Sequence, residues 1–86
     1  MMVEVFGPGC GRCRQTVKIM ELALEQMGKK PGEDSMVQKV EDPRVGAMRG
    51  VMTTPAVAID GRIVSQGKIP TVDDAKTWIV AGTHGG

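Results

Sequence analysis

Long hydrophobic runs, a strong net charge and repeated segments are all missing from this sequence. No apolar run approaches the roughly 20 residues that a membrane-spanning helix needs. The formal net charge of +1 provides no electrostatic basis for binding nucleic acid or an anionic membrane. The first ten residues have no basic segment before their apolar stretch, so we expect no secretory signal and a cytoplasmic location.

Repeats, low-complexity tracts and linkers are also missing, and the length suits one small domain. We therefore expect a single domain over residues 1–86. Gly82 is expected to end its last helix and to leave residues 82–86 as a flexible tail. Nothing in the length or composition requires an oligomer, so we expect a monomer.

Cysteine and histidine are scarce, and this limits the chemistry of the chain. The only such residues are Cys10, Cys13 and His84. Structural disulfides are rare in the cytoplasm, and a bridge between Cys10 and Cys13 would close a loop too small to stabilise the fold much. A structural zinc ion needs four ligands, and the chain offers three, one of them in the expected tail. The cysteine pair is therefore expected to be redox-active or to handle a metal.

Apolar periodicity and turn residues predict four strands and three helices. Runs rich in β-formers predict strands at residues 2–6, 36–40, 56–60 and 62–66. Asp60-Gly61 fits a type I′ turn and predicts that the last two strands form a hairpin. Helical spacing predicts helices from residue 10 or 11 to about 27, in the segment that follows Asp42, and from about 71 to 81. One apolar stripe on the first helix is formed by Val17, Met20, Leu24 and Met27.

The short second helix has a clear start signal. Asp42 is expected as its N-cap and Pro43 as its first residue. Val45 and Met48 are expected to form its inner face, and Gly50 to end it.

The resulting order, β-α-β-α-β-β-α, predicts an α/β fold. The first two strands are joined through a helix, so they should be parallel with a right-handed crossover. The hairpin adds an antiparallel pair. A four-stranded mixed sheet flanked by helices would bury every apolar face of these elements.

Cys10 stands where the first predicted strand gives way to the first predicted helix. Unsatisfied backbone N–H groups and the positive end of the helix dipole favour an anion at that place. Arg12, Arg14 and Lys18 add positive charge nearby. We therefore predict a pKa for Cys10 below the free-thiol value of about 8.5, which would make it the reactive thiolate. Cys13, one turn into the helix, should have its sulfur turned inward.

Three features occur together along the chain: Cys10-Gly11-Arg12-Cys13 after the first strand, Thr54-Pro55 before the third, and an Asp-Gly hairpin followed by a final helix. In this combination the chain resembles thioredoxin-fold proteins, in particular the small glutaredoxin-sized thioredoxin-like "redox-active disulfide" proteins of bacteria and archaea. The resemblance covers about residues 2–81. The commonest signature of the fold has Trp before the first cysteine and Pro between the two, where this chain has Gly9 and Gly11-Arg12.

The resemblance implies a thiol–disulfide oxidoreductase that reduces protein disulfides, with Cys10 as nucleophile and Cys13 as resolving cysteine. The Cys10–Cys13 disulfide would itself be the redox-active group, so no bound cofactor is expected. Electrons would come from a separate donor of the thioredoxin-reductase type. Many thioredoxins place a buried acid beneath the second cysteine as a proton relay. Glu4 can take this place, or it can lie on an exposed face of the first strand.

The resemblance also implies that the Thr54–Pro55 bond is cis and that Pro55 lies against the cysteine pair. The backbone of Thr54 would then pair with an extended client segment. The residues expected to contact a client are Gly9, Gly11, Arg12, Thr54 and Pro55. Val51 and Met52, with Gly9, would border a small apolar docking surface, although Met52 fits a core position equally well.

A metal-binding or metal-delivery module is the alternative function. Small metallochaperones also carry two cysteines, two residues apart, between a strand and a helix, and here Cys10 and Cys13 would be the ligands. Their sequences usually have Met two residues before the first cysteine, where this chain has Pro8, and their fold ends in a strand. Redox exchange is therefore the favoured interpretation.

Overall fold

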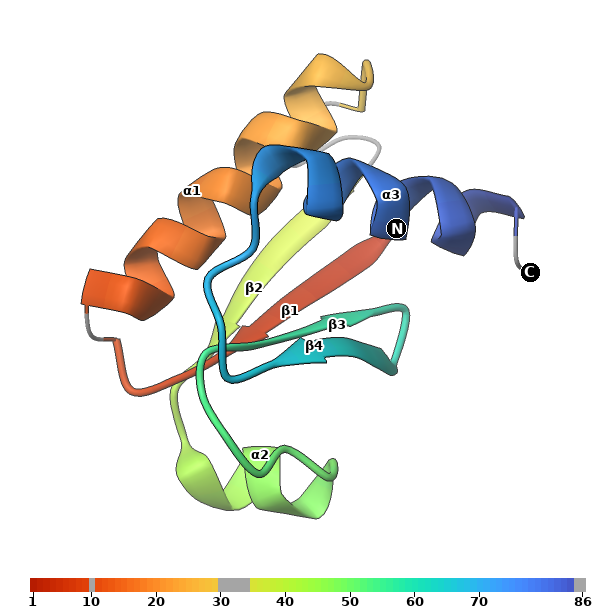
Figure 1. The fold of residues 1–86 in the computed structure, drawn as a ribbon. Coiled ribbons are helices and arrows are strands. Elements are labelled where there is room, and N and C mark those ends of the chain that lie inside the picture. Colours follow the sequence, from red (N-terminus) through yellow and green to blue (C-terminus); the bar gives the residue numbers. More distant parts are fainter. Residues whose placement is uncertain (10, 30–34, 85–86) are drawn as a thin grey trace.

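The computed structural model describes residues 1–9, 11–29 and 35–84, and for residues 82–84 it describes the backbone alone. The chain forms β1 (Met2–Phe6), α1 (Gly11–Gln26), β2 (Met36–Val40), α2 (Pro43–Met48), β3 (Ala56–Ile59), β4 (Arg62–Gln66) and α3 (Val72–His84), as Figure 1 shows. The predicted order of elements is confirmed. Among the helices of the described residues, none combines the length and the apolar composition needed to cross a bilayer.

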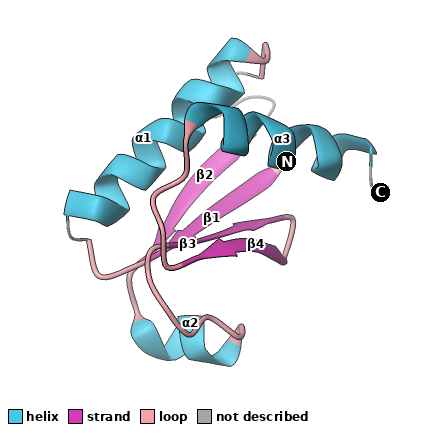
Figure 2. Cartoon of the chain, in the orientation of Figure 1, coloured by secondary structure: helices cyan, strands magenta, loops and turns pink. Residues whose placement is uncertain are grey.

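The sheet has four strands in the order β2-β1-β3-β4. β1 and β2, which α1 connects, are parallel, and β1 pairs with β3 in the antiparallel direction. β3 and β4 form the expected hairpin, in which Asp60 and Gly61 both have positive φ, 50° and 87°, as a type I′ turn requires. The sheet is therefore mixed, with α1 and α3 on one face and α2 on the other (Figure 2).

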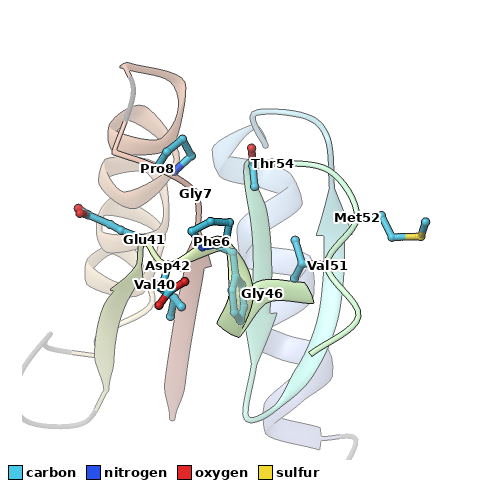
Figure 3. A pocket seen from close by; sticks show the side chains of 11 residues that line it. Phe6, Gly7, Pro8, Val40, Glu41, Asp42, Gly46, Val51, Met52 and Thr54 are labelled. Atoms are coloured by element: carbon cyan, nitrogen blue, oxygen red, sulfur yellow. The ribbon is translucent and has the colours of Figure 1, made fainter. Parts of the chain in front are cut away.

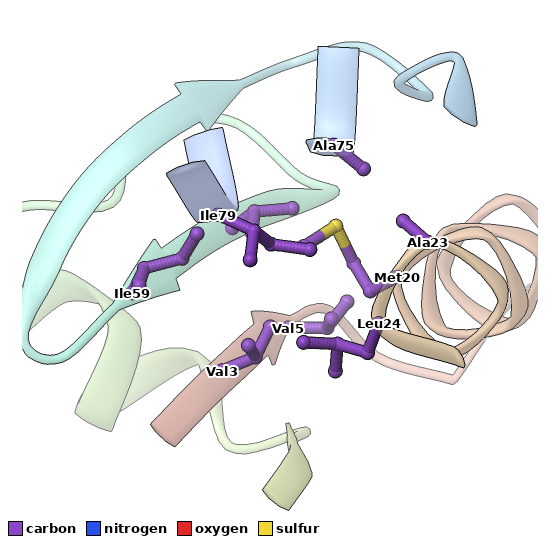
Figure 4. Packing of buried hydrophobic residues seen from close by; sticks show 9 residues of the cluster. Val3, Val5, Met20, Ala23, Leu24, Ile59, Ala75 and Ile79 are labelled. Atoms are coloured by element: carbon purple, nitrogen blue, oxygen red, sulfur yellow. The ribbon is translucent and has the colours of Figure 1, made fainter. Parts of the chain in front are cut away.

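The main core lies between the sheet and the pair α1 and α3. Because successive strand residues face opposite sides, Val3 and Val5 of β1 both point toward these helices. Met20 and Leu24 of α1 and Ile79 of α3 fill the space above them, and all three are fully buried (Figure 4). Each such side chain contributes about 1.5–3 kcal/mol through removal from water. The predicted stripe on α1 is thus confirmed, and its other two residues, Val17 and Met27, are half-buried at the edge of this core.

A smaller apolar cluster lies on the opposite face, under α2. It contains Phe6, Ala56 and Ala58, which are buried. The prediction for the inner face of α2 is wrong, because Val45 and Met48 are 40% and 87% exposed. The buried residue of α2 is Gly46, where a Cβ would lie 3.6 Å from the ring of Phe6. α2 thus approaches the sheet through its backbone at Gly46, where there is no room for a large inward side chain.

The last helix begins with the reciprocal hydrogen bonds of a capping box. The Asp74 backbone N–H donates to Thr71 Oγ1 at 3.1 Å, and the Thr71 N–H donates to Asp74 Oδ2 at 3.2 Å. The expectation that Gly82 ends this helix is wrong, because α3 continues to His84. Glycine weakens a helix by only about 1 kcal/mol relative to alanine and does not force an end. Residues 85–86 of the expected tail lie outside the described residues.

Candidate active site

The first turn of α1 places Cys13 close to the end of β1. The Cys13 side chain is buried, with 4% of its surface exposed. A Cβ built on Gly7, just after β1, would overlap Cys13 Sγ. The sulfur of Cys13 therefore lies against bare backbone, and the inward orientation expected for this residue is what the structure shows. Cys10 lies outside the described residues, so its exposure and its pairing stay predictions.

The segment before β3 reaches the same place beside Gly7. The Cβ built on Gly7 would also lie 3.8 Å from Thr54 Cβ. The Thr54–Pro55 peptide bond is cis, as the resemblance implied, with Pro55 buried and Thr54 exposed. Cys13 and Thr54 therefore lie close together beside Gly7, although they come from distant parts of the sequence.

A pocket opens beside this junction, with a volume of about 360 Å³. Figure 3 shows its lining, which comes from the ends of β1 and β2, from α2 and from the segment before β3. Phe6, Val40 and Val51 supply apolar surface. Met52 also lines the pocket but is 89% exposed and extends away from the other side chains (Figure 3). The core interpretation of Met52 is therefore wrong, and its place is at the border of the pocket.

A smaller hollow lies next to the pocket, and the two share Gly7 and Glu41. Cys13 lines this hollow, as does Gly9. Gly9 has a φ of +84°, a conformation that strongly favours glycine, and a Cβ on it would lie 3.3 Å from Glu41 Oε1. The expected docking surface is thus divided, with Gly9 in the hollow that Cys13 also lines and Val51 with Met52 in the pocket.

The loop before β3 is attached to the end of β4 by Gln66. The backbone N–H groups of Met52 and Thr53 both donate to Gln66 Oε1, at 2.7 and 3.4 Å. Neither Gln66 nor Glu41 was found as a site residue from the sequence. Their positions depend on contacts between segments far apart in the chain, and no local pattern signals such contacts.

Glu4 lies on the face of the sheet that carries α2, away from α1 and Cys13. The guanidinium of Arg49 donates to its two carboxylate oxygens at 3.0 and 2.9 Å. This contact holds the pKa of Arg49 above its ordinary value, and the guanidinium carbon lies 5.4 Å from the centre of the Phe6 ring. Glu4 is therefore not beneath Cys13, and it is not on an exposed face either, since 14% of its side chain is accessible.

The remaining expected site residues lie at the start of α1. Gly11 and Arg12 are both exposed there, and a Cβ on Gly11 would meet nothing within 4 Å. Within residues 1–9, 11–29 and 35–81, a set that leaves out Cys10 and His84, no three His, Cys, Asp or Glu side chains are grouped as metal ligands.

A mixed sheet with α1 and α3 on one face, a buried cysteine in the first turn of α1 and a cis peptide bond that follows the nearby Thr54 define a thioredoxin-type protein. Comparison with known proteins agrees. Residues 1–80 match the family model described as "Thioredoxin domain", and the chain belongs to this family. It is 38% identical over 76 residues to a protein named "Thioredoxin" from Methanocaldococcus jannaschii, which covers 88% of this chain and 83% of that protein. The chain is therefore a thioredoxin-like redox protein.

Proposed function

We propose that this protein is a thiol–disulfide oxidoreductase that reduces disulfides in other proteins through Cys10 and Cys13. The observation that carries the proposal is the position of the Cys13 sulfur, which is buried beside Gly7 with Thr54 close to the same point. The Cys13 sulfur is shielded and lies next to the exposed Thr54. This arrangement suits a reaction in which the second thiol reacts only after the client is bound.

The reaction is a pair of exchanges in which two electrons pass to the client. The Cys10 thiolate attacks one sulfur of the client disulfide, so that the client S–S bond breaks and a Cys10–client bond forms. The released client thiolate takes a proton from water. The Cys13 thiolate then attacks the Cys10 sulfur, which forms the Cys10–Cys13 disulfide and releases the second client thiolate. The client is reduced and the protein is oxidised.

The positions of the two cysteines in the chain support this division of roles. Cys10 directly precedes α1, where the backbone N–H groups and the helix dipole favour a thiolate. Cys13 has little contact with solvent, and a bulky client disulfide cannot reach it directly. Cys13 is therefore suited to attack the neighbouring Cys10 sulfur and not the free client.

The pocket beside Thr54 is the proposed place for the client. Its apolar lining can accept a side chain of an extended segment that passes Thr54 on the way to the sulfurs. Gly9, Gly11 and Arg12 would contact the same segment on the α1 side. The cycle needs no bound cofactor, because a separate reductase of the thioredoxin-reductase type would return two electrons to the disulfide. We place this activity in the cytoplasm.

The proposal is tested by equilibrating the protein in thiol–disulfide buffers of known potential and trapping its thiols. We expect a reversible transition in which both cysteines change together, with a tenfold change in the ratio of the two forms for each 29.6 mV. The reduced protein should also accelerate the reduction of a protein disulfide. If the protein has no oxidised form and binds copper or zinc tightly instead, metal delivery is its function and the proposal is wrong.

A further inference from the structure

The segment of residues 51–54 has an unusual form of support. It lies between α2 and β3, and in the described part of the chain the N–H groups of Met52 and Thr53 donate to no backbone carbonyl. Both donate instead to one side-chain atom, Gln66 Oε1, at 2.7 and 3.4 Å. Gln66 is exposed at the end of β4, where it pairs with Ala56 of β3.

The residue after Gln66 is bonded to Pro55, which directly follows this segment. The Gly67 N–H donates to the Pro55 carbonyl at 2.9 Å. Gly67 has a φ of +77°, and a Cβ on it would lie 2.9 Å from Thr53 Oγ1. The end of β4 therefore forms hydrogen bonds to the chain on both sides of Thr54. Gln66 accepts from Met52 and Thr53 before it, and Gly67 donates to Pro55 after it.

Thr54 lies between these hydrogen bonds, beside Gly7 and Cys13. Met52 and Thr54 also line the pocket proposed for the client. Fixing a peptide segment before a partner binds removes part of the entropy cost of binding. The support is thus placed where it would act on client binding, while Gln66 itself is not among the residues that line the pocket or the smaller hollow.

We propose that Gln66 is a positioning residue for client binding, which acts by holding the backbone of Met52 and Thr53. This inference rests on the proposed function and names the part of the protein that prepares its client site. Its effect should be limited to clients large enough to use the pocket. A small disulfide that reaches Cys10 directly should react at the same rate whether the segment is held or loose.

The test compares Gln66→Met, which keeps the length of the side chain and removes the acceptor, with Gln66→Glu, which keeps an acceptor oxygen. Reduced protein is assayed with insulin as a protein disulfide and with oxidised glutathione as a small one. We expect Gln66→Met to raise KM for insulin about three- to tenfold, as loss of one or two hydrogen bonds implies, with kcat unchanged. The rate constant with oxidised glutathione should stay the same, and Gln66→Glu should restore the wild-type KM.

Amide hydrogen exchange followed by NMR provides the second readout. The N–H groups of Met52 and Thr53 should exchange faster in Gln66→Met, while those of β1 should not change. A variant with unaltered KM for insulin, or one with equal losses toward insulin and oxidised glutathione, would overturn the inference while the proposed function stands. If the wild-type protein reduces neither substrate, the proposed function fails and the inference fails with it.

Discussion

Gly7 and Cys13 lie so close together that one methyl group at residue 7 would overlap the Cys13 sulfur. Gly7 does not have positive φ, so its backbone conformation is open to other residues. Its N–H also donates to the Val40 carbonyl at 2.9 Å, which fixes the backbone beside the sulfur. The requirement for glycine at this position therefore comes from the approach of the sulfur and not from the turn.

The first prediction concerns this contact. Gly7→Ala should lower the free energy of unfolding by about 1–3 kcal/mol, because the added methyl group must displace the sulfur or the backbone of α1. Gly11→Ala is the matched control, since a Cβ there meets nothing within 4 Å. It should leave stability unchanged or raise it by a few tenths of a kcal/mol. Urea unfolding followed by the fluorescence of Trp78 measures both, and equal stability of the two variants would contradict the account.

The second prediction separates the two leucines of α1. Leu24 is fully buried in the main core, while Leu22 is 43% exposed. Leu24→Ala should cost about 2–5 kcal/mol, because it removes buried methyl groups and leaves a cavity. Leu22→Ala should cost less than about 1 kcal/mol. Thermal unfolding of the two variants gives the comparison, and the reverse order would show that the helix packs in a different rotation.

The third prediction concerns Glu4 and its separation from the sulfurs. Glu4→Gln should lower the urea midpoint, because it weakens the paired hydrogen bonds with Arg49 on the α2 face. It should not shift the pH dependence of the exchange rate, since Glu4 is on the other face of the sheet from Cys13. Stopped-flow measurement of insulin reduction between about pH 6 and pH 9 tests this. A shift of the pH profile in this variant would contradict the account and support Glu4 as a proton relay.

The fourth prediction concerns the N-cap of α2. The Arg44 backbone N–H donates to Asp42 Oδ1 at 2.9 Å, and together with the Arg44 side chain it holds the pKa of Asp42 below its ordinary value of 3.8. Because folding lowers the pKa of Asp42, its charged form stabilises the fold at pH values above its ordinary pKa. This contribution disappears as the pH falls through the folded-state pKa.

Asp42→Asn keeps a capping side chain and removes the charge, so it isolates this effect. The urea midpoint of the wild type should exceed that of the variant above about pH 5, and the difference should shrink toward pH 2. Measurement of both midpoints across this range tests the sign. A difference that grows in acid would contradict the assigned contacts.

Much of the fold could be predicted because local signals agree with the tertiary contacts. The spacing of Met20 and Leu24 identified the buried face of α1, and Asp60-Gly61 identified the hairpin. The inner face of α2 could not be predicted in this way. Two apolar residues in a helix of six do not define a face, and the close packing of Gly46 on Phe6 depends on the sheet beneath it.

The residues of the candidate site also separate into those with a local sequence signal and those that depend on tertiary contacts. Cys13 and Thr54 belong to short motifs, so the sequence identified them and the structure brings them together beside Gly7. Gln66 and Glu41 act on residues of other segments, through a hydrogen bond to Met52 and through proximity to Gly9. Such relations exist only once the chain has folded, so no pattern along the sequence indicates them.

The central claim is that Cys10 attacks a client disulfide and Cys13 resolves the intermediate. Its most direct test mixes reduced Cys13→Ser protein with excess insulin, stops the reaction with acid and examines the products by non-reducing gel and mass spectrometry. The account predicts a covalent adduct of the protein with an insulin chain through Cys10, and no adduct under the same conditions with Cys10→Ser. An adduct that forms equally well with Cys10→Ser, or in neither variant, would contradict it.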